Sequence, residues 1–215
     1  MKGKTVSVVY MLFSIVFCVS LIVSNLMEMK VIDCGWLTLT GGLLIFPISY
    51  IVNDCITEIW GYKNAKRIIW TGFIANFFAV ALTGLATLLP SPAEWEGGEH
   101  FNYIFGLAPR MVIASMMAFL AGSFLNAKVM SKMKMSAMNH ETQHWSWHFS
   151  VRAIVSTIAG ESLDSVIFFP LAFWGLMPVG ELVKVMLIQV ILKTMYEVLV
   201  LPVTIGIVKK VNKLI

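Results

Sequence analysis

Long uninterrupted runs of apolar residues, separated by short polar segments, dominate the chain. Six such runs cover approximately residues 5–27, 37–60, 68–89, 110–130, 151–174 and 181–208. A helix needs about 20 mostly apolar residues to cross the hydrocarbon core of a bilayer, so each run is long enough to span it. The strands of a membrane barrel would instead alternate in polarity. The pattern therefore predicts an all-α integral membrane protein, a bundle of six transmembrane helices that forms a single domain over residues 1–215.

The composition excludes a soluble fold. Of the 215 residues, 58% are hydrophobic and 13% are charged, whereas soluble domains hold about 45–50% apolar and about 25% charged residues. The three cysteines, Cys18, Cys34 and Cys55, have no paired spacing, which argues against a disulfide framework or a structural metal. The net charge of +4 arises from basic residues between the apolar runs, so it does not indicate a nucleic-acid partner.

The basic residues gather in alternate loops. Twelve lie on one side of the predicted bundle: Lys2, Lys4, Lys63, Lys66, Arg67, Lys128, Lys132, Lys134, Arg152, Lys209, Lys210 and Lys213. The other side has three, Lys30, Arg110 and Lys184, and its longest loop carries Glu94, Glu96 and Glu99. Because cytoplasmic loops carry an excess of Lys and Arg, this asymmetry predicts that both termini are cytoplasmic.

Ionisable residues inside the second apolar run need an explanation. An ionised side chain at bilayer depth costs at least about 2.5–3.5 kcal/mol. Asp54 follows Asn53, and Glu58 lies four residues later, so the two carboxylates share one face of a helix. Glu58 is close enough to Lys63 and the basic residues that follow for a salt bridge at the membrane surface, but Asp54 lies about one turn deeper, where a functional role is favoured.

The fifth and sixth runs carry a second set of polar residues. Glu161 and Asp164 are three residues apart, and Gln189, Lys193 and Glu197 follow one another at four-residue steps. Lys193 and Glu197 are spaced to pair within their own helix. The set is either a charge-paired core or a polar cavity for a solute or ion. We favour the cavity, because buried ion pairs contribute little net stability.

Glycines and prolines interrupt the same runs. Gly41, Gly42 and Pro47 fall in the second, Pro170 in the fifth and Pro202 in the sixth. Broken helices near a central binding site recur in secondary transporters, and this pattern makes Pro47 a candidate gating residue. No HExxH, GxSxG, Walker A or GxGxxG motif is present, so we expect neither an enzyme nor a cofactor. His140, His144 and His148 have helical spacing, but we interpret them as part of an interfacial helix and expect no metal.

Three segments give the chain a family resemblance. SNLMEMK (24–30), FPISYIVNDCITEIWGYKNAKRIIW (46–70) and LDSVIFFPLAFWG (163–175) resemble the bacterial queuosine precursor transporters of the vitamin uptake transporter-like family. The resemblance implies uptake of a 7-deazaguanine through the bacterial cytoplasmic (inner) membrane, to supply a modified tRNA base. Carried over by position, it implies functional roles for Asn25, Lys30, Asp54, Glu58, Arg67, Asp164, Lys193 and Glu197.

Such a substrate fits the polar residues. A deazaguanine presents a ring N–H beside an exocyclic amine, which one carboxylate can accept in a bidentate pair, and we expect Asp164 or Glu161 to do so. Lys193, Gln189 or Asn53 would donate to the carbonyl oxygen, and aromatic residues such as Phe168 and Tyr50 would stack on the ring. Asp54 or Glu58 would serve coupling or gating.

Two other functions stay open from the sequence. The chain could be the substrate-binding subunit of an energy-coupling-factor importer, in which a separate ATPase drives uptake. It could also be a membrane assembly protein or enzyme with no transported solute. We expect the lipid bilayer and a nucleobase-like small molecule as partners. We also expect a homodimer, because six short spans alone provide little protein to surround a transport pathway.

Overall fold

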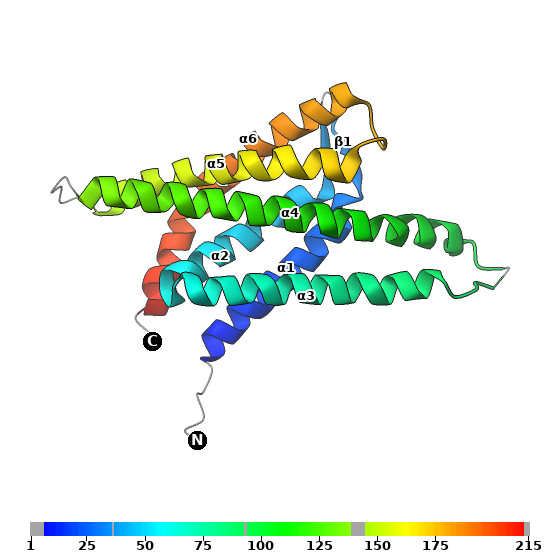
Figure 1. Ribbon diagram of the computed structural model, residues 1–215, viewed down its shortest axis with the longest axis horizontal. Helices are drawn as coiled ribbons and strands as arrows, with labels where there is room; N and C mark the ends of the chain where they lie inside the picture. Colours follow the sequence, from blue (N-terminus) through cyan, green and yellow to red (C-terminus); the bar gives the residue numbers. More distant parts are fainter. Residues whose placement is uncertain (1–6, 36, 93, 139–144, 213–215) are drawn as a thin grey trace, which may run out of the picture. The chain divides into compact units, whose positions relative to one another are not determined.

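The computed structural model describes residues 7–35, 37–92, 94–138 and 145–212, and these are mostly helical (Figure 1). The elements in chain order are α1 (Val8–Glu28), β1 (Val31–Asp33), β2 (Thr38–Thr40), the 3-10 helix η1 (Gly41–Leu44), α2 (Phe46–Trp60), α3 (Tyr62–Thr87), α4 (Gly97–Met138), α5 (Trp145–Phe173) and α6 (Val179–Asn212). The strands β1 and β2 pair in a short two-stranded sheet. The predicted all-α character is therefore confirmed apart from this hairpin.

Within the described residues, five helical segments are long and apolar enough to cross a bilayer. They are Val8–Glu28, Tyr62–Thr87, Gly97–Asn126, Ile154–Phe173 and Val179–Val211. The helix α2 has 15 residues, which corresponds to about 22 Å at the usual rise per residue and is shorter than a bilayer core. The predicted class of membrane protein is thus supported, whereas the sixth span and the orientation of the termini stay predictions.

The second apolar run differs from the helix predicted over 37–60. Its first residues form β2 and η1, and the α-helix begins at Phe46. The backbone N–H of Gly41 donates to the carbonyl of Lys30 at 2.8 Å, which closes the hairpin. A Cβ added at Gly41 would lie 2.6 Å from the Met27 carbonyl oxygen, so this approach requires glycine. Pro47 lies in the first turn of α2, where its missing N–H leaves no helical hydrogen bond unmade.

Two further boundary predictions were wrong. The connections expected at 90–109 and 131–150 are shorter, because α4 begins at Gly97 and continues to Met138. The segment from Lys128 is rich in Lys and Met, which are good helix formers and extend the helix beyond its apolar part. Pro170 and Pro202 also do not interrupt their helices, since α5 and α6 continue through them; membrane helices tolerate proline where neighbouring groups satisfy the freed carbonyl.

The chain divides into two compact units. The first contains the described residues of Met1–Val31, Thr40–Val112 and Pro202–Ile215. In it α1 packs against α2, α3 and η1, and α2 packs against α3. Phe17 and Leu21 of α1 are fully buried and lie over Gly72 of α3, where an added Cβ would be 2.9 Å from the Phe17 ring. The glycine at this position of α3 therefore lets the large side chains of α1 pack closely.

The second unit contains Ile32–Leu39 and Ile113–Leu201, which include the later part of α4, all of the described α5 and most of α6. The helices α4 and α5 approach each other at Gly122 and Gly160, where a Cβ on Gly122 would lie 2.8 Å from the Gly160 carbonyl oxygen. One side of α6 presents large apolar side chains at four-residue steps, and these are exposed: Val183, Leu187, Ile191 and Met195. Such a face is suited to contact lipid, while the opposite face of α6 is buried.

Candidate functional site

Two acids and one lysine form a buried cluster in the second unit. Lys193 of α6 places its Nζ 3.4 Å from Glu161 Oε2 and 3.4 Å from Asp164 Oδ2, both of α5. None of the three side chains is more than 3% exposed. Charge-assisted hydrogen bonds between ammonium and carboxylate groups are usually about 2.7–2.9 Å long. The ammonium group of this acid–lysine cluster (Glu161, Asp164 and Lys193) is therefore shared loosely between two carboxylates.

Helical spacing brings these side chains to one place. Glu161 and Asp164 are three residues apart, so they project from the same buried face of α5. On α6, Gln189 precedes Lys193 by one turn, and its side chain is also fully buried. The structure thus supplies a carboxylate pair from one helix and a cation with a neighbouring carboxamide from another.

An aromatic group lies next to the acids along α5. Phe168 comes one turn after Asp164, and its ring centroid is 5.3 Å from that of Phe169 and 6.1 Å from that of Phe173. Phe169 and Phe173 stack with centroids 5.7 Å apart and an interplanar angle of 20°. All three are buried. Flat apolar surface is therefore available within a turn of a buried carboxylate, as recognition of an aromatic base requires.

Several hydroxyl groups that the sequence analysis missed are buried in the same unit. Ser165, directly after Asp164, is fully buried, and its Oγ has no hydrogen-bond partner among the described residues. The same holds for the hydroxyls of Ser115 and Ser123 on α4 and Thr194 on α6. An unsatisfied buried hydroxyl costs free energy, so a polar partner for these groups would stabilise the unit. The signal in the sequence was the run GESLDS (160–165), whose serines are interleaved with the acids.

The candidates in the second apolar run and on either side of it belong to the first unit. Asn53 and Asp54 are half-buried, and Glu58, Lys30 and Arg67 are exposed. The Arg67 guanidinium donates to Asn64 Oδ1 at 3.2 Å. The side chains of Pro47, Tyr50 and Glu197 lie outside the described part of the structure, although their backbones are helical; the predicted pairing of Lys193 with Glu197 therefore stays a prediction.

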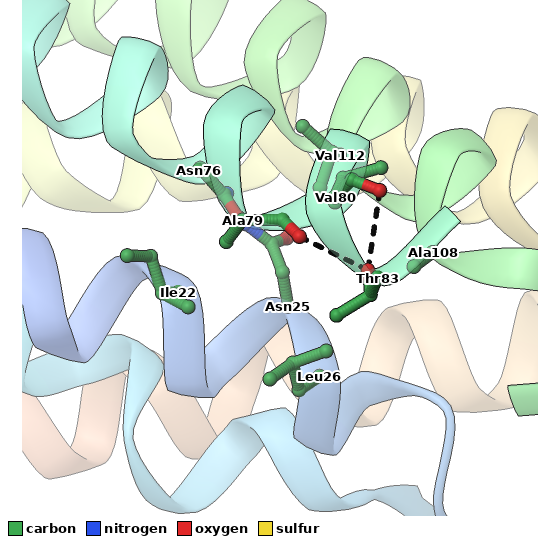
Figure 2. Close-up of a pocket in the computed structure, with 9 residues that line it drawn as sticks. All are labelled: Ile22, Asn25, Leu26, Asn76, Ala79, Val80, Thr83, Ala108 and Val112. Atoms are coloured by element: carbon green, nitrogen blue, oxygen red, sulfur yellow. Dashed lines mark hydrogen bonds between the residues drawn. The ribbon is translucent and has the colours of Figure 1, made fainter. Parts of the chain in front are cut away.

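The cavity that Asn25 lines is too small for the proposed substrate. Asn25 is buried in α1 and lines a cavity of about 20 Å³ in the first unit (Figure 2). Pockets for small organic ligands measure about 300–1,000 Å³, so this cavity does not hold a bicyclic base. Residues 139–144, with His140 and His144, lie outside the described residues, and the described part of the chain contains no group of three or more His, Cys, Asp or Glu placed to hold a metal ion.

A buried carboxylate in the first unit was also missed. Glu28, near the end of α1, is 3% exposed. It packs over η1, where a Cβ added at Gly42 would overlap its carboxyl group. The sequence offered a signal in SNLMEMK (24–30), where this acid interrupts the end of an apolar run. Glu28 therefore joins Asp54 as a candidate ionisable group of the first unit.

Comparison with known proteins identifies the family. Residues 40–207 match the family model described as "Putative vitamin uptake transporter". The chain belongs to this family. Among curated relatives, it is 24% identical over 180 residues to the "Probable queuosine precursor transporter" of Bacillus subtilis (strain 168), an alignment that covers 83% of this chain and 76% of the relative. No solved structure matches the chain.

Two further relatives of this vitamin uptake transporter family carry similar names. The "Queuosine precursor transporter" of Escherichia coli (strain K12) is 28% identical over 69% of this chain and 61% of its own length. The "Probable queuosine precursor transporter" of Haemophilus influenzae (strain ATCC 51907 / DSM 11121 / KW20 / Rd) is 27% identical over 63% of this chain and 52% of its own length. The alignments with these two relatives thus span less than two thirds of their length.

Family membership confirms the resemblance noted in the sequence. It supports a role in transport rather than in catalysis. Together with the membrane-spanning helices, it identifies a multi-pass protein of the bacterial inner membrane.

Proposed function

We propose that this chain imports a queuosine precursor, namely 7-cyano-7-deazaguanine, 7-aminomethyl-7-deazaguanine or queuine, through the bacterial inner membrane. The observation that carries the proposal is the buried acid–lysine cluster, with Lys193 Nζ 3.4 Å from each carboxylate, beside the aromatic side chains of α5. The names of the three relatives support this class of substrate.

The cluster has the hydrogen-bonding groups that a deazaguanine needs. The ring N–H and the exocyclic amine of the base are adjacent donors, and one carboxylate accepts both in a bidentate pair. The carbonyl oxygen of the base is an acceptor, for which Lys193 and Gln189 are the buried donors. The Lys193 ammonium is shared between Glu161 and Asp164. When the base binds, it donates its hydrogen bonds to one of these carboxylates, and the ammonium remains paired with the other.

The remaining predicted residues have supporting roles in this proposal. Phe168 supplies the surface on which the flat ring stacks, one turn from Asp164. Asp54 and Glu58 of the first unit serve coupling or gating, as their position in the second apolar run suggested. A base held by hydrogen bonds and stacking, without a covalent step, is consistent with a protein that moves its ligand unchanged.

Six membrane crossings with cytoplasmic termini form part of the same proposal. The four residues of η1 add about 8 Å to the roughly 22 Å of α2, which together match a hydrocarbon core of about 30 Å. If this segment did not cross, the basic residues after α2, after α4 and after α6 would all lie on the side opposite to Lys2 and Lys4. With the crossing, all four groups of basic residues lie in the cytoplasm, as the positive-inside rule requires.

Uptake by the purified protein in lipid vesicles tests this function. Each deazaguanine is offered with and without a proton gradient, and uptake by the chain alone is the expected result. Glu181→Gln is a matched control for Asp164→Asn, because Glu181 pairs with Lys184 at 2.9 Å on the exposed surface. Binding without uptake would instead indicate the substrate-binding subunit of an energy-coupling-factor importer, and no binding of any deazaguanine would refute the proposal.

A further inference from the structure

The small cavity of the first unit has polar residues among its mostly apolar lining. It measures about 20 Å³ and lies among α1, α3 and the first part of α4. Most of its lining is apolar, but three polar side chains reach it: Asn25 of α1, and Asn76 and Thr83 of α3 (Figure 2). Empty cavities in proteins are apolar. Polar groups around this one therefore indicate an occupant that forms hydrogen bonds.

Asn76 provides an unmet donor. Its side chain is 1% exposed, and its Nδ2 has no hydrogen-bond partner among the described residues. A buried amide donor that meets neither water nor protein is destabilising, and in native proteins such groups are nearly always satisfied. An acceptor is therefore required next to Asn76, in the middle of a membrane helix.

The other two polar residues provide acceptors. Asn25 uses its Nδ2 to donate to the Leu21 carbonyl at 3.1 Å, which leaves its amide oxygen to accept. The Thr83 hydroxyl donates to the carbonyls of Ala79 at 3.0 Å and Val80 at 3.1 Å (Figure 2), so its oxygen can only accept in any further contact. The cavity is thus lined by one unmet donor and two oxygen acceptors.

We propose that one ordered water molecule binds in this cavity and links α1 to α3. Water accepts from Asn76 Nδ2 and donates to the oxygens of Asn25 and Thr83. A cavity needs about 10–15 Å³ to hold one water, and a buried water makes about three hydrogen bonds, so both the volume and the polar groups fit. Asn25 is then a ligand of structural water, a role that is independent of the transported substrate.

The direct test is an experimental structure of the full chain at a resolution that orders water. We expect a density peak within about 2.7–3.2 Å of Asn76 Nδ2. Absence of a peak would overturn the proposal. A thermal unfolding temperature that rises with sodium chloride but not with choline chloride in the wild type, and in neither salt for Asn76→Leu, would also overturn it, since the site would then bind a cation.

A substitution gives a second test, because it should change the unfolding temperature in opposite directions for a cavity that holds water and for one that is empty. In a dry cavity, Asn76→Leu removes an unsatisfied donor and raises the unfolding temperature. With water bound, the same change loses hydrogen bonds, and the temperature falls by about 2–4 °C or more. Asn64→Leu is the control on the same helix, because Asn64 Nδ2 already donates to the Trp60 carbonyl at 2.8 Å. A rise for Asn76→Leu beside a fall for Asn64→Leu would refute the bound water.

Discussion

Gly122→Ala tests whether the close approach of α4 and α5 positions the acid–lysine cluster. An added Cβ would lie 2.8 Å from the Gly160 carbonyl oxygen and 3.1 Å from Asp164 Cβ, whereas ordinary contact begins at 3.4 Å. The helices must therefore separate by about 0.6 Å at this point. The Gly160 oxygen is a backbone atom and cannot rotate away, so the displacement is passed to α5, which carries both acids.

The size of the effect follows from this overlap. Overpacking of this kind costs about 1–3 kcal/mol, and about 2–4 °C is lost per kcal/mol in a chain of this size, so the unfolding temperature should fall by about 2–12 °C. Displacing Asp164 by several tenths of an ångström should also weaken the bidentate contact with the base that we propose for Asp164 or Glu161. A loss of about 1.4 kcal/mol in that contact corresponds to a tenfold weaker affinity.

The assay compares two glycines of one helix. Gly106, also in α4, has nothing within 4 Å of an added Cβ, so Gly106→Ala should raise stability by about 0.5–1 kcal/mol through helix propensity alone. Thermal unfolding in detergent and equilibrium binding of queuine are measured for both variants and the wild type. If Gly122→Ala unfolds no earlier than Gly106→Ala and binds queuine as the wild type does, the reasoning from the glycine contact is wrong.

Three further predictions concern charge and topology. Asp164→Asn places an amide donor against the donors of the base, so affinity should fall about tenfold or more in the binding assay; unchanged binding by this variant and by Glu161→Gln would exclude the acids as the recognition groups. Lys193→Met removes the ammonium from the buried carboxylates and should destabilise the protein by about 3–5 kcal/mol. Adding Glu161→Gln to Lys193→Met should restore part of that loss, and no recovery would contradict a shared ammonium. A cysteine placed at Glu96 should react with a membrane-impermeant reagent from outside, and one at Ser136 should not; the reverse pattern would contradict the cytoplasmic termini.

The sequence predicted the helices well where apolar residues continue without interruption. It failed at the start of the second run, because hydropathy does not distinguish a helix from an apolar hairpin. There Thr38 and Thr40 favour a strand, and Gly41 packs so close to α1 that an added Cβ would lie 2.6 Å from the Met27 carbonyl oxygen. That contact joins segments distant in sequence, so no local pattern reveals it.

The candidate site shows the same limit. Helical spacing placed Glu161 and Asp164 on one face, because that relation lies within a single helix. For Lys193, the structure gives contacts with the acids of α5, about 30 residues earlier, which no spacing within α6 reveals. The burial of Ser165 also depends on helix packing. Periodicity therefore identifies the polar face of each helix, and tertiary packing decides which faces meet.

The length of α4 makes this small membrane protein suitable for a helical fusion. At 42 residues the helix is about 63 Å long, roughly twice the thickness of a hydrocarbon core. Its apolar part ends at Asn126, and the helix continues without a break for 12 more residues to Met138. A helical fusion partner joined in register after Met138 would inherit the direction of α4. Such a rigid fiducial would give a 24.0 kDa protein enough mass outside the detergent belt for particle alignment in cryo-electron microscopy.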